Sequence, residues 1–315
     1  MRAVTIADGD LLWADHPDPV PGDLELLVAV RAAGLNAADL LQRRGAYPAP
    51  AGSPPDIPGL ELAGEVVAAG SRVTRFAVGD RVMALAGGGG QAELAVVDER
   101  VAMAVPATWD WVAAGGFCEG FCTAFDALFR QCRLQLGERV LVTGAAGGVG
   151  CATLQLAAAA GALPVASARH ASTHRSLEAL GARLAALPDE ALASGPFDVA
   201  VELVGAASFP GALQALRPGG RVAVVGVGSG ATVSLDLLGL MQRRASVSGA
   251  TLRARSLDEK GTVVAGVQRS VLPLAEAGRI RVPVAAAVPM AEAAEAYEQF
   301  ARGGKLGKIV LVRDP

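Results

Sequence analysis

A hydrophobic run that leads straight into a glycine-rich turn constrains the fold of this chain more than any other feature. Val140–Val142 is typical of a buried strand, Thr143–Gly150 forms the turn, and the alanine-rich segment Cys151–Ala160 is typical of a helix. Glycine allows a tight turn and a close approach of the backbone to a ligand, and the N–H groups at a helix N-terminus favour a pyrophosphate. A plain strand-to-helix turn can have the same letters, but the strand before it and the helix after it favour a dinucleotide site.

The backbone of this turn is expected to make most of the cofactor contacts. Ala145 stands where the first glycine of the pattern G-x-G-x-x-G would stand. The residues expected to bind the cofactor here are Gly144, Ala145, Gly147, Gly148, Val149 and Gly150.

The sequence pattern changes near Ala113. Before it, short extended segments separated by Pro/Gly turns predict a β-rich region, interrupted by a helix at Ala37–Arg44 and a proline-dense loop at Tyr47–Asp56. After it, strands and helices alternate with short connections, which is typical of a doubly wound parallel sheet in an α/β protein. Closing strands at Val284–Val288 and Lys308–Val312 indicate that the chain returns to complete the β-rich region.

The remaining elements follow from hydrophobic periodicity and from Gly/Pro punctuation. Further strands are expected at Val4–Ile6, Glu25–Ala32, Glu65–Ala69, Arg81–Ala84, Gln91–Val97, Pro164–Ala168, Val199–Val204 and Arg221–Val225. Helices are expected at Ala113–Arg130, Ser172–Leu180, Ala212–Leu216, Leu257–Ala277 and Ala291–Arg302.

Composition argues against several classes of function. The 315 residues suit two domains, and a net charge of −3 without blocks of like charge gives no footprint for nucleic-acid or membrane-surface binding. No apolar run reaches the roughly 20 residues that span a bilayer. The N-terminus begins as a strand without a signal-peptide pattern. The four cysteines lack metal-site spacing and are expected to be reduced, which predicts a cytoplasmic protein without a metal site.

The segment after the glycine turn indicates which dinucleotide is bound. The second strand of such a domain commonly ends in an acid that binds the adenosine ribose 2′-OH. Here the segment Val165–His170 contains no carboxylate, whereas Ser167 and Arg169 suit a 2′-phosphate, because guanidinium is a bidentate phosphate partner. NADPH is therefore the expected cofactor. The alternative is that Arg169 is simply a solvated arginine.

Motifs spread over nearly the whole chain occur in one characteristic order. In sequence order they are Gly34–Asp39, Pro58–Gly64, Val78–Val82, the glycine turn, Leu180–Ala182, Leu216–Arg221 and Gly307–Leu311. They resemble the medium-chain dehydrogenase/reductase superfamily, in its zinc-free quinone oxidoreductase branch. Gly249–Ser256 is similar to the subgroup that includes the tumour-suppressor-inducible quinone oxidoreductases.

This resemblance implies an architecture and a metal status. It implies a GroES-like catalytic domain of residues 1–119 and 260–315, a Rossmann domain of residues 120–259, an active site in the cleft between them, and a homodimer through the cofactor domain. Zinc members carry cysteine at the position of Asn36 and Gly-His-Glu where this chain has Gly59-Leu60-Glu61. Zinc-type alcohol oxidation needs a Lewis acid, so that reaction is not expected.

The resemblance also implies the two catalytic residues. Hydride transfer to a quinone needs a donor that stabilises the oxygen as negative charge develops. Asn36 could hydrogen-bond the cofactor or the substrate, and Tyr47 could donate to the substrate oxygen. The alternatives are that Asn36 is an ordinary helix N-cap and that Tyr47 merely packs in its loop.

Several cofactor contacts are likewise implied by the resemblance. Thr123 matches a threonine beside the nicotinamide, although its hydroxyl could instead bond its own helix. The backbone at Gly226 and Gly228 would approach the carboxamide, unless these residues only form a strand-to-loop turn. Thr251 and Lys308 complete the expected cofactor-binding set. Thr173 stands where relatives often carry a lysine for the 2′-phosphate.

The expected activity is metal-independent hydride transfer from NADPH to quinones or related α,β-unsaturated carbonyl compounds. Two alternatives stay open at this point. One is a 2-enoyl thioester reductase, for which no charged entry for a phosphopantetheine-type substrate is evident in the sequence. The other is a weakly catalytic NADPH-binding or sensor protein.

Overall fold

The computed structural model describes residues 1–313, and the chain divides into two compact units. Unit 1 consists of Met1–Glu119 together with the segment that begins at Leu252, and unit 2 is Gly120–Thr251. The units divide at residues 119/120 and 251/252, whereas the domain boundaries expected from the resemblance are 119/120 and 259/260. Residues just after 251 belong to unit 1 because Arg253 bonds Gln42, Tyr47 and Gly87. Residues 314 and 315, at the end of the predicted catalytic domain, lie outside the described residues.

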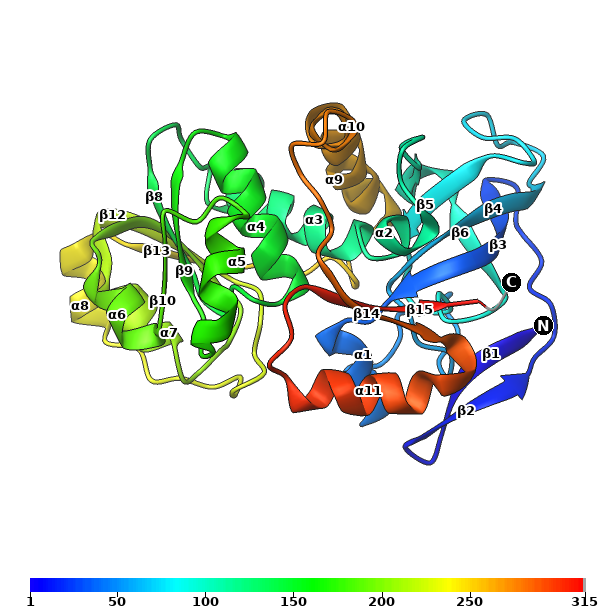
Figure 1. Ribbon diagram of the computed structural model, residues 1–315, viewed down its shortest axis with the longest axis horizontal. Coiled ribbons are helices and arrows are strands. Elements are labelled where there is room, and N and C mark those ends of the chain that lie inside the picture. The colour runs from blue at the N-terminus through cyan, green and yellow to red at the C-terminus, as the bar shows by residue number, and fades with distance from the viewer. Residues whose placement is uncertain (314–315) are drawn as a thin grey trace. The chain divides into compact units, whose positions relative to one another are not determined.

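Unit 2 is built on a parallel six-stranded sheet with the order β10-β9-β8-β11-β12-β13, which confirms the predicted doubly wound topology (Figure 1). The chain begins in the middle of the sheet, moves to one edge, and then crosses back to build the other half. Its strands are β8 (Arg139–Val142), β9 (Leu163–Ser167), β10 (Leu184–Ala186), β11 (Phe197–Glu202), β12 (Leu216–Val224) and β13 (Ser246–Gly249).

Helices cover both faces of this sheet. Crossovers between parallel strands are right-handed, so a chain that reverses its direction of travel also changes the face on which it places its helices. One face carries a core cluster that includes Phe197, Phe209 and Leu213, against which α6, α7 and α8 pack. The helices of the unit are α3 (Cys118–Phe125, which crosses in from unit 1), α4 (Gly148–Ala159), α5 (His174–Glu178), α6 (Pro188–Ala193), α7 (Phe209–Gln214) and α8 (Leu237–Arg243).

Unit 1 contains a seven-stranded sheet with the order β14-β15-β3-β4-β5-β7, and β6 pairs with β3 outside that path. Segments from both ends of the chain meet in it, because β15 pairs antiparallel with β3, as the closing strands of the sequence predict. Its strands are β3 (Glu25–Gly34), β4 (Glu61–Ala69), β5 (Arg81–Leu85), β6 (Leu94–Asp98), β7 (Ala102–Ala104), β14 (Val284–Pro289) and β15 (Lys308–Val312).

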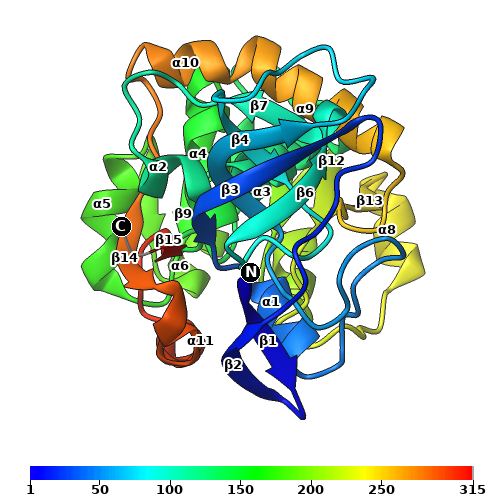
Figure 2. The same ribbon diagram turned by 90° about the vertical axis from the view of Figure 1, so that its right-hand side faces the viewer.

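A separate hairpin and several helices surround this sheet. The hairpin of β1 (Arg2–Ala7) and β2 (Asp10–Asp15) packs against the C-terminal helix of the unit (Figures 1 and 2). Val28, Leu62 and Ile309 of the sheet share one core cluster with Tyr297 of that helix. The helices are α1 (Ala37–Arg43), α2 (Trp111–Gly115), α9 (Leu257–Ser270), α10 (Leu272–Glu276) and α11 (Ala293–Arg302).

Two long predicted helices are wrong as continuous elements. The segment Ala113–Arg130 is divided into α2, α3 and a π-helical turn at Asp126–Gln131, because the pair Gly115-Gly116 ends α2. The segment Leu257–Ala277 is divided into α9 and α10, with Pro273 in the first turn of the second helix. The sequence also gave no indication of the short elements β2, β7, β10, α6, α8 and β13.

Candidate active site

The glycine turn of unit 2 has the geometry that its sequence predicts. Gly144 has a φ of +59°, which is in the left-handed region that favours glycine. A Cβ on Gly150 would lie 2.5 Å from the Ala145 carbonyl oxygen, so only glycine fits where α4 packs against the turn. The first N–H groups of α4, at Gly148 and Val149, have no acceptor within their own helix. This backbone cradle fits the pyrophosphate of a dinucleotide.

The end of β9 and helix α3, which carry predicted cofactor-binding residues, both lie against this turn. The Ala145 N–H donates to the Ser167 carbonyl oxygen at 3.1 Å, which ties the turn to the carboxyl end of β9. A Cβ on Gly120 would lie 3.4 Å from the Gly148 carbonyl oxygen, so α3 passes beside the start of α4. Thr123, three residues further along α3, lies on the same helix face as Gly120.

The end of β9 carries the two residues that the sequence predicts to bind a 2′-phosphate. Ser167 is buried at the strand end, and Arg169 is exposed two residues later. Thr173, which stands where relatives often carry a lysine, is buried, and its hydroxyl donates to the His170 carbonyl oxygen at 2.7 Å. The Thr173 side chain is thus used to close a local turn. A phosphate at this strand end would depend on Ser167 and Arg169.

Gly226 and Gly228, which follow β12, differ in how closely other backbone packs against them. A Cβ on Gly226 would collide with the Leu203 carbonyl group, and the Gly226 N–H donates to the Glu202 carbonyl oxygen at 3.0 Å, so this residue is needed for backbone packing. At Gly228 the nearest atom to an added Cβ would be 4.0 Å away, which leaves that backbone open to a ligand.

Glu202 is a residue that the sequence analysis missed. Its side chain is fully buried at the carboxyl end of β11, where its Oε1 accepts from the Val204 and Gly205 N–H groups and from the Ser208 hydroxyl. It thereby holds the loop after β11. An acid at the end of a continuous hydrophobic run was the signal that could have found it, since such an acid must be partnered.

In unit 1, a buried ionic cluster surrounds Asn36. The Lys308 ammonium donates to the Asn36 Oδ1 at 2.7 Å and forms an ion pair with the Glu61 carboxylate. The Asn36 Nδ2 donates to Glu61 Oε1 at 3.1 Å and to the Gly34 carbonyl oxygen at 3.2 Å. The Glu119 N–H donates to Glu61 Oε2 at 2.9 Å. One lysine thus provides the positive charge that a fully buried glutamate requires.

Asp39 fixes the backbone beneath this cluster. Its carboxylate accepts from the Asn36 N–H at 2.8 Å, at the start of α1, and from the Gly59 N–H at 3.2 Å. Burial raises the pKa of Asp39 to about 6, although both N–H donors and the Lys308 charge favour the ionised form. Gly59 has a φ of +111°, and a Cβ there would lie 2.5 Å from the Gln91 nitrogen. Asp39 therefore joins the Gly34–Asp39 motif to the Pro58–Gly64 motif by hydrogen bonds.

The structure separates the predicted site residues into two groups. Gly144–Gly150, Thr123, Ser167, Arg169, Gly226, Gly228 and Thr251 belong to unit 2, and Asn36, Tyr47 and Lys308 belong to unit 1. Asn36 occupies the N-cap position of α1, but its side chain makes no capping hydrogen bond, and its amide instead bonds Glu61 and Lys308. The roles of Asn36 in catalysis and of Lys308 in cofactor binding stay predictions.

Removing Lys308 is expected to destabilise the protein strongly. In Lys308→Met the Glu61 carboxylate keeps its burial and loses its counter-charge, which costs about 3–5 kcal/mol of the free energy of unfolding. Urea denaturation measures this loss. The matched control is Lys308→Met combined with Glu61→Gln, which removes both charges and should recover at least half of it. Equal stability of the single and double variants would contradict the assigned ion pair.

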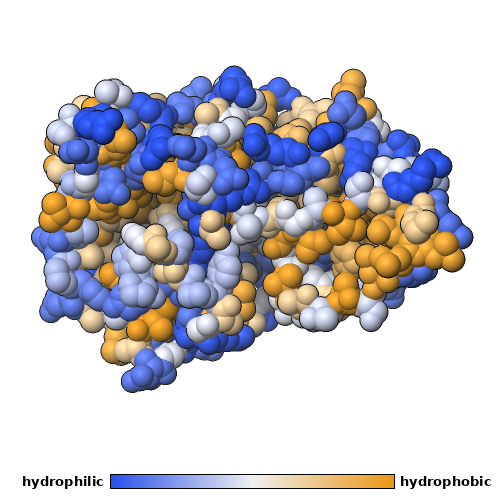
Figure 3. Space-filling model, turned by 180° about the vertical axis from the view of Figure 1, so that it is seen from behind, coloured by the Kyte–Doolittle hydropathy of each residue, from blue (hydrophilic) through white to orange (hydrophobic). Residues whose placement is uncertain are grey.

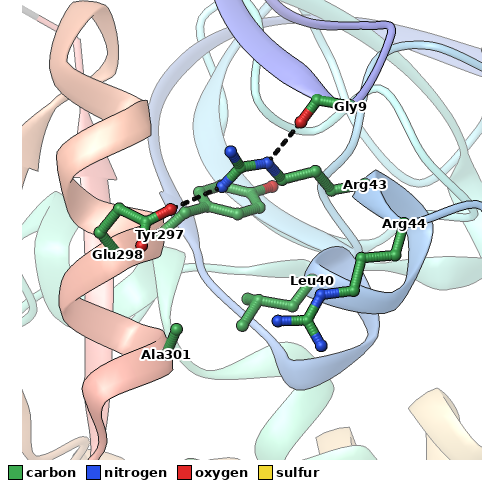
Figure 4. Close-up of a pocket in the computed structure, with 7 residues that line it drawn as sticks. All are labelled: Gly9, Leu40, Arg43, Arg44, Tyr297, Glu298 and Ala301. Atoms are coloured by element: carbon green, nitrogen blue, oxygen red, sulfur yellow. Dashed lines mark hydrogen bonds and ion pairs between the residues drawn. The ribbon is translucent and has the colours of Figure 1, made fainter.

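A surface cavity of about 310 Å³ lies elsewhere in unit 1 and contains none of the predicted site residues. Arg43 crosses it, with its Nε donating to the Gly9 carbonyl oxygen at 2.7 Å and its Nη1 paired with Glu298 at 3.0 Å (Figure 4). These contacts join the β1–β2 turn, α1 and α11, so Arg43 has a structural role. The cavity is lined by Gly9, Leu40, Arg43, Arg44, Tyr297, Glu298 and Ala301.

Residues 1–313 contain neither a metal-ligand cluster nor a membrane-spanning helix. No group of three or more His, Cys, Asp or Glu side chains in this range is arranged to hold a metal ion. Within the same range, no helix combines the length and the apolar character that crossing a bilayer requires.

The sequence matches two families of protein domain. Residues 22–107 match the family described as alcohol dehydrogenase GroES-like domain, and residues 153–311 match the family described as zinc-binding dehydrogenase. Among curated proteins, the quinone oxidoreductase of Lama guanicoe is 30% identical over 99% of this chain and 97% of that protein. The polyketide synthase GfsB of Streptomyces halstedii is 34% identical over 96% of this chain, which corresponds to 5% of that much longer protein.

Solved structures agree with these matches. A thermostable alcohol dehydrogenase from Pyrobaculum aerophilum is 32% identical, with a TM-score of 0.86 and coverage of 99% of each chain. A mycobacterial protein solved in complex with NADPH is 25% identical, with a TM-score of 0.88, and the match covers 99% of this chain and 100% of that one. Both similarities extend over both units.

Proposed function

The chain belongs to the medium-chain dehydrogenase/reductase superfamily, and from that premise we propose that it is a metal-independent, NADPH-dependent reductase of quinones or related α,β-unsaturated carbonyl compounds. The observation that carries the proposal is the buried Lys308–Glu61–Asn36 cluster. Asn36 stands where zinc members carry a cysteine, its amide is bonded to Glu61 and Lys308, and the cluster offers neither a thiolate nor an imidazole to a metal.

The cofactor site supports NADPH. The glycine cradle fits a pyrophosphate, and the end of β9 presents Ser167 and Arg169 without a carboxylate that would repel a 2′-phosphate. Thr123 and the backbone at Gly228 are the proposed contacts of the nicotinamide half. When bound, NADPH supplies a hydride, which carries two electrons. The NADPH complex of the mycobacterial neighbour is consistent with this assignment.

In unit 1, Tyr47 is the proposed proton donor. Its O–H bond breaks as a new O–H bond forms on the acceptor oxygen, so hydride and proton together complete a two-electron reduction. Solvent then restores the phenol proton. Asn36 is the second proposed catalytic residue, and its side chain is held in one orientation by Glu61 and Lys308. Both N–H groups of its amide are already used, in bonds to Glu61 and to the Gly34 carbonyl oxygen, so the Tyr47 hydroxyl is the donor proposed to stabilise negative charge on the acceptor oxygen.

The test of this proposal is stopped-flow oxidation of NADPH in the presence of 1,4-benzoquinone, naphthoquinones and small enones. Turnover of at least one of these acceptors is expected. Failure to turn over every acceptor, despite bound NADPH, would refute the proposal and favour an NADPH-binding or sensor protein.

A second enzymatic candidate is a 2-enoyl thioester reductase, which the similarity to a polyketide synthase favours. Both candidates use the same reduction of a conjugated carbonyl. They differ in the substrate, so a crotonyl thioester of N-acetylcysteamine and a simple enone should be compared under identical conditions. A larger kcat/KM for the thioester would favour this second candidate.

We also propose a homodimer that forms through unit 2. Strand β13 is an edge strand of the parallel sheet, and nearby α8 exposes Leu237, Leu238 and Met241 by 65%, 62% and 71%. Figure 3 shows hydrophobic surface over this end of unit 2, on the right-hand side of that view. A second copy of the chain could pair with the edge strand and cover these side chains. We propose that the protein functions in the cytoplasm, where its four buried cysteines stay reduced.

A charge on α8 is expected to prevent dimer formation. Leu238→Glu combined with Met241→Glu would place two carboxylates in an apolar interface and should yield monomers in analytical ultracentrifugation, whereas the wild-type protein sediments at twice the monomer mass. Leu12→Glu is the matched control, since Leu12 is 52% exposed but lies in unit 1. A dimer that survives both α8 substitutions would contradict this interface.

A further inference from the structure

Arg253 is a buried arginine that the proposed mechanism does not yet use. It lies in the loop between β13 and α9, and only 5% of its surface is exposed. Burial of a guanidinium is costly unless its charge is needed where it is placed. Burial lowers the pKa of Arg253, and the pKa of the nearby Lys260 is lowered as well, by its own burial and by the charge of Arg253.

The guanidinium of Arg253 joins three segments of unit 1. Its Nε donates to the Gly87 carbonyl oxygen at 2.8 Å, its Nη1 donates to the Tyr47 carbonyl oxygen at 2.9 Å, and its Nη2 donates to Gln42 Oε1. The Gln42 Nε2 in turn donates to the Pro55 carbonyl oxygen at 3.1 Å. The proline-dense loop that carries Tyr47 is therefore held near both ends by one arginine and one glutamine.

All three acceptors of Arg253 are neutral. No ion pair is formed by Arg253 within the described range 1–313, and the charges of Asp39 and Glu119 act on its guanidinium electrostatically. Its guanidinium carbon lies 5.0 Å from the centre of the Tyr47 ring. The positive charge is thus uncompensated by direct contact and is directed at the aromatic ring of the proposed proton donor.

We propose that Arg253 is a positioning residue for Tyr47. It donates a hydrogen bond to the Tyr47 carbonyl oxygen and lies against the Tyr47 ring, and its positive charge stabilises the negative charge that develops on the phenol oxygen. This inference rests on the proposed function of Tyr47. As the phenol O–H bond breaks, the electron pair stays on the Tyr47 oxygen beside the guanidinium, and the proton bonds to the acceptor oxygen. Arg253 itself exchanges no proton and touches no substrate.

A double-mutant cycle tests this proposal. Arg253→Met is expected to lower kcat about tenfold while the Kd for NADPH stays unchanged, because Arg253 lies outside the glycine cradle. In a Tyr47→Phe background the same substitution should change kcat less than about twofold, since no phenol remains to be stabilised. Arg253→Lys, which keeps the charge, should recover part of the lost kcat and also serves if the methionine variant folds poorly.

Arg75 provides a matched control. Its guanidinium also donates to backbone carbonyl groups and to a glutamine, Gln268 at 2.9 Å, and also lies near an aromatic ring, Phe76 at 5.2 Å. It makes no contact with Tyr47, so Arg75→Met should leave kcat unchanged. An equal loss of kcat from Arg253→Met with and without the Tyr47 hydroxyl would overturn the proposal, as would an unchanged kcat in Arg253→Met.

A spectroscopic readout separates this inference from the proposed activity. The chain has two tyrosines, so ¹³Cζ-tyrosine labelling gives two ring signals, and Tyr47→Phe identifies the one from Tyr47. In Arg253→Met the Tyr47 signal is expected to move, while the signal of Tyr297, which bonds Gln91 in the core, stays in place. An unmoved Tyr47 signal would refute the contact whatever the activity. A wild-type protein that reduces no acceptor would refute the proposed function alone.

Discussion

Tyr47→Phe is expected to lower kcat for quinone reduction about 100-fold, which is within the range that a positioned proton donor contributes. The substitution removes one oxygen and keeps the ring that packs near Arg253, so the loop at Tyr47–Asp56 should retain its conformation. Stopped-flow measurement of NADPH oxidation gives kcat, and quenching of intrinsic fluorescence gives the Kd for NADPH.

The Tyr47 prediction is specific to turnover. The Kd for NADPH should change less than twofold, because the cofactor cradle lies in unit 2 and Tyr47 lies in unit 1. Tyr297→Phe is the control, since its hydroxyl donates to Gln91 at 2.8 Å within the core and should affect stability more than kcat. Full turnover in Tyr47→Phe would remove the proposed role of this tyrosine.

Arg169→Ala is expected to weaken NADPH binding about 10- to 100-fold, which corresponds to the roughly 1.5–3 kcal/mol of a hydrogen bond to a charged group. NADH binding should change little, because NADH lacks the 2′-phosphate. The structure adds one reason to expect that the effect on NADPH binding is large. The Thr173 hydroxyl is bonded to the His170 carbonyl oxygen in a local turn. Position 173 therefore supplies no positive charge that could replace the charge of Arg169.

Arg183→Ala is the matched control for the cofactor prediction. Arg183 is also an exposed arginine of unit 2, and it lies just before β10 rather than at the end of β9. Its removal should reduce the affinity for NADPH and NADH equally or not at all. If Arg169→Ala also leaves the ratio of the two Kd values unchanged, Arg169 is only a solvated arginine and the cofactor preference has another origin.

Local patterns were sufficient to predict most of the fold. The apolar run Val140–Val142 and the glycines after it determine β8, the turn and α4, because only glycine fits at 150. Alternation of strand and helix then predicts a parallel sheet. Periodicity failed where elements are short or exposed. Helix α8 has seven residues, none of them buried, and β13 has four, so both are too short for a helical or strand periodicity to be recognised.

Parts of the candidate site could not be predicted because they depend on contacts over long sequence distances. Lys308 and Glu61 are 247 residues apart, and nothing near Glu61 in the sequence indicates which cation neutralises it. Arg253 and Tyr47 are 206 residues apart. A charged residue within an apolar or glycine-rich stretch was the only available signal, and it reveals that a partner exists without revealing which residue it is.

The most direct test of the central claim is transfer of deuterium from C4-labelled NADPH to an enone by protein whose metal content has been measured after treatment with a chelator. Metal-independent hydride transfer predicts one deuterium on the β-carbon of the saturated product, with kcat unchanged by the chelator. Loss of turnover on chelation that is restored by Zn²⁺, or a product without deuterium at that carbon, would contradict the account.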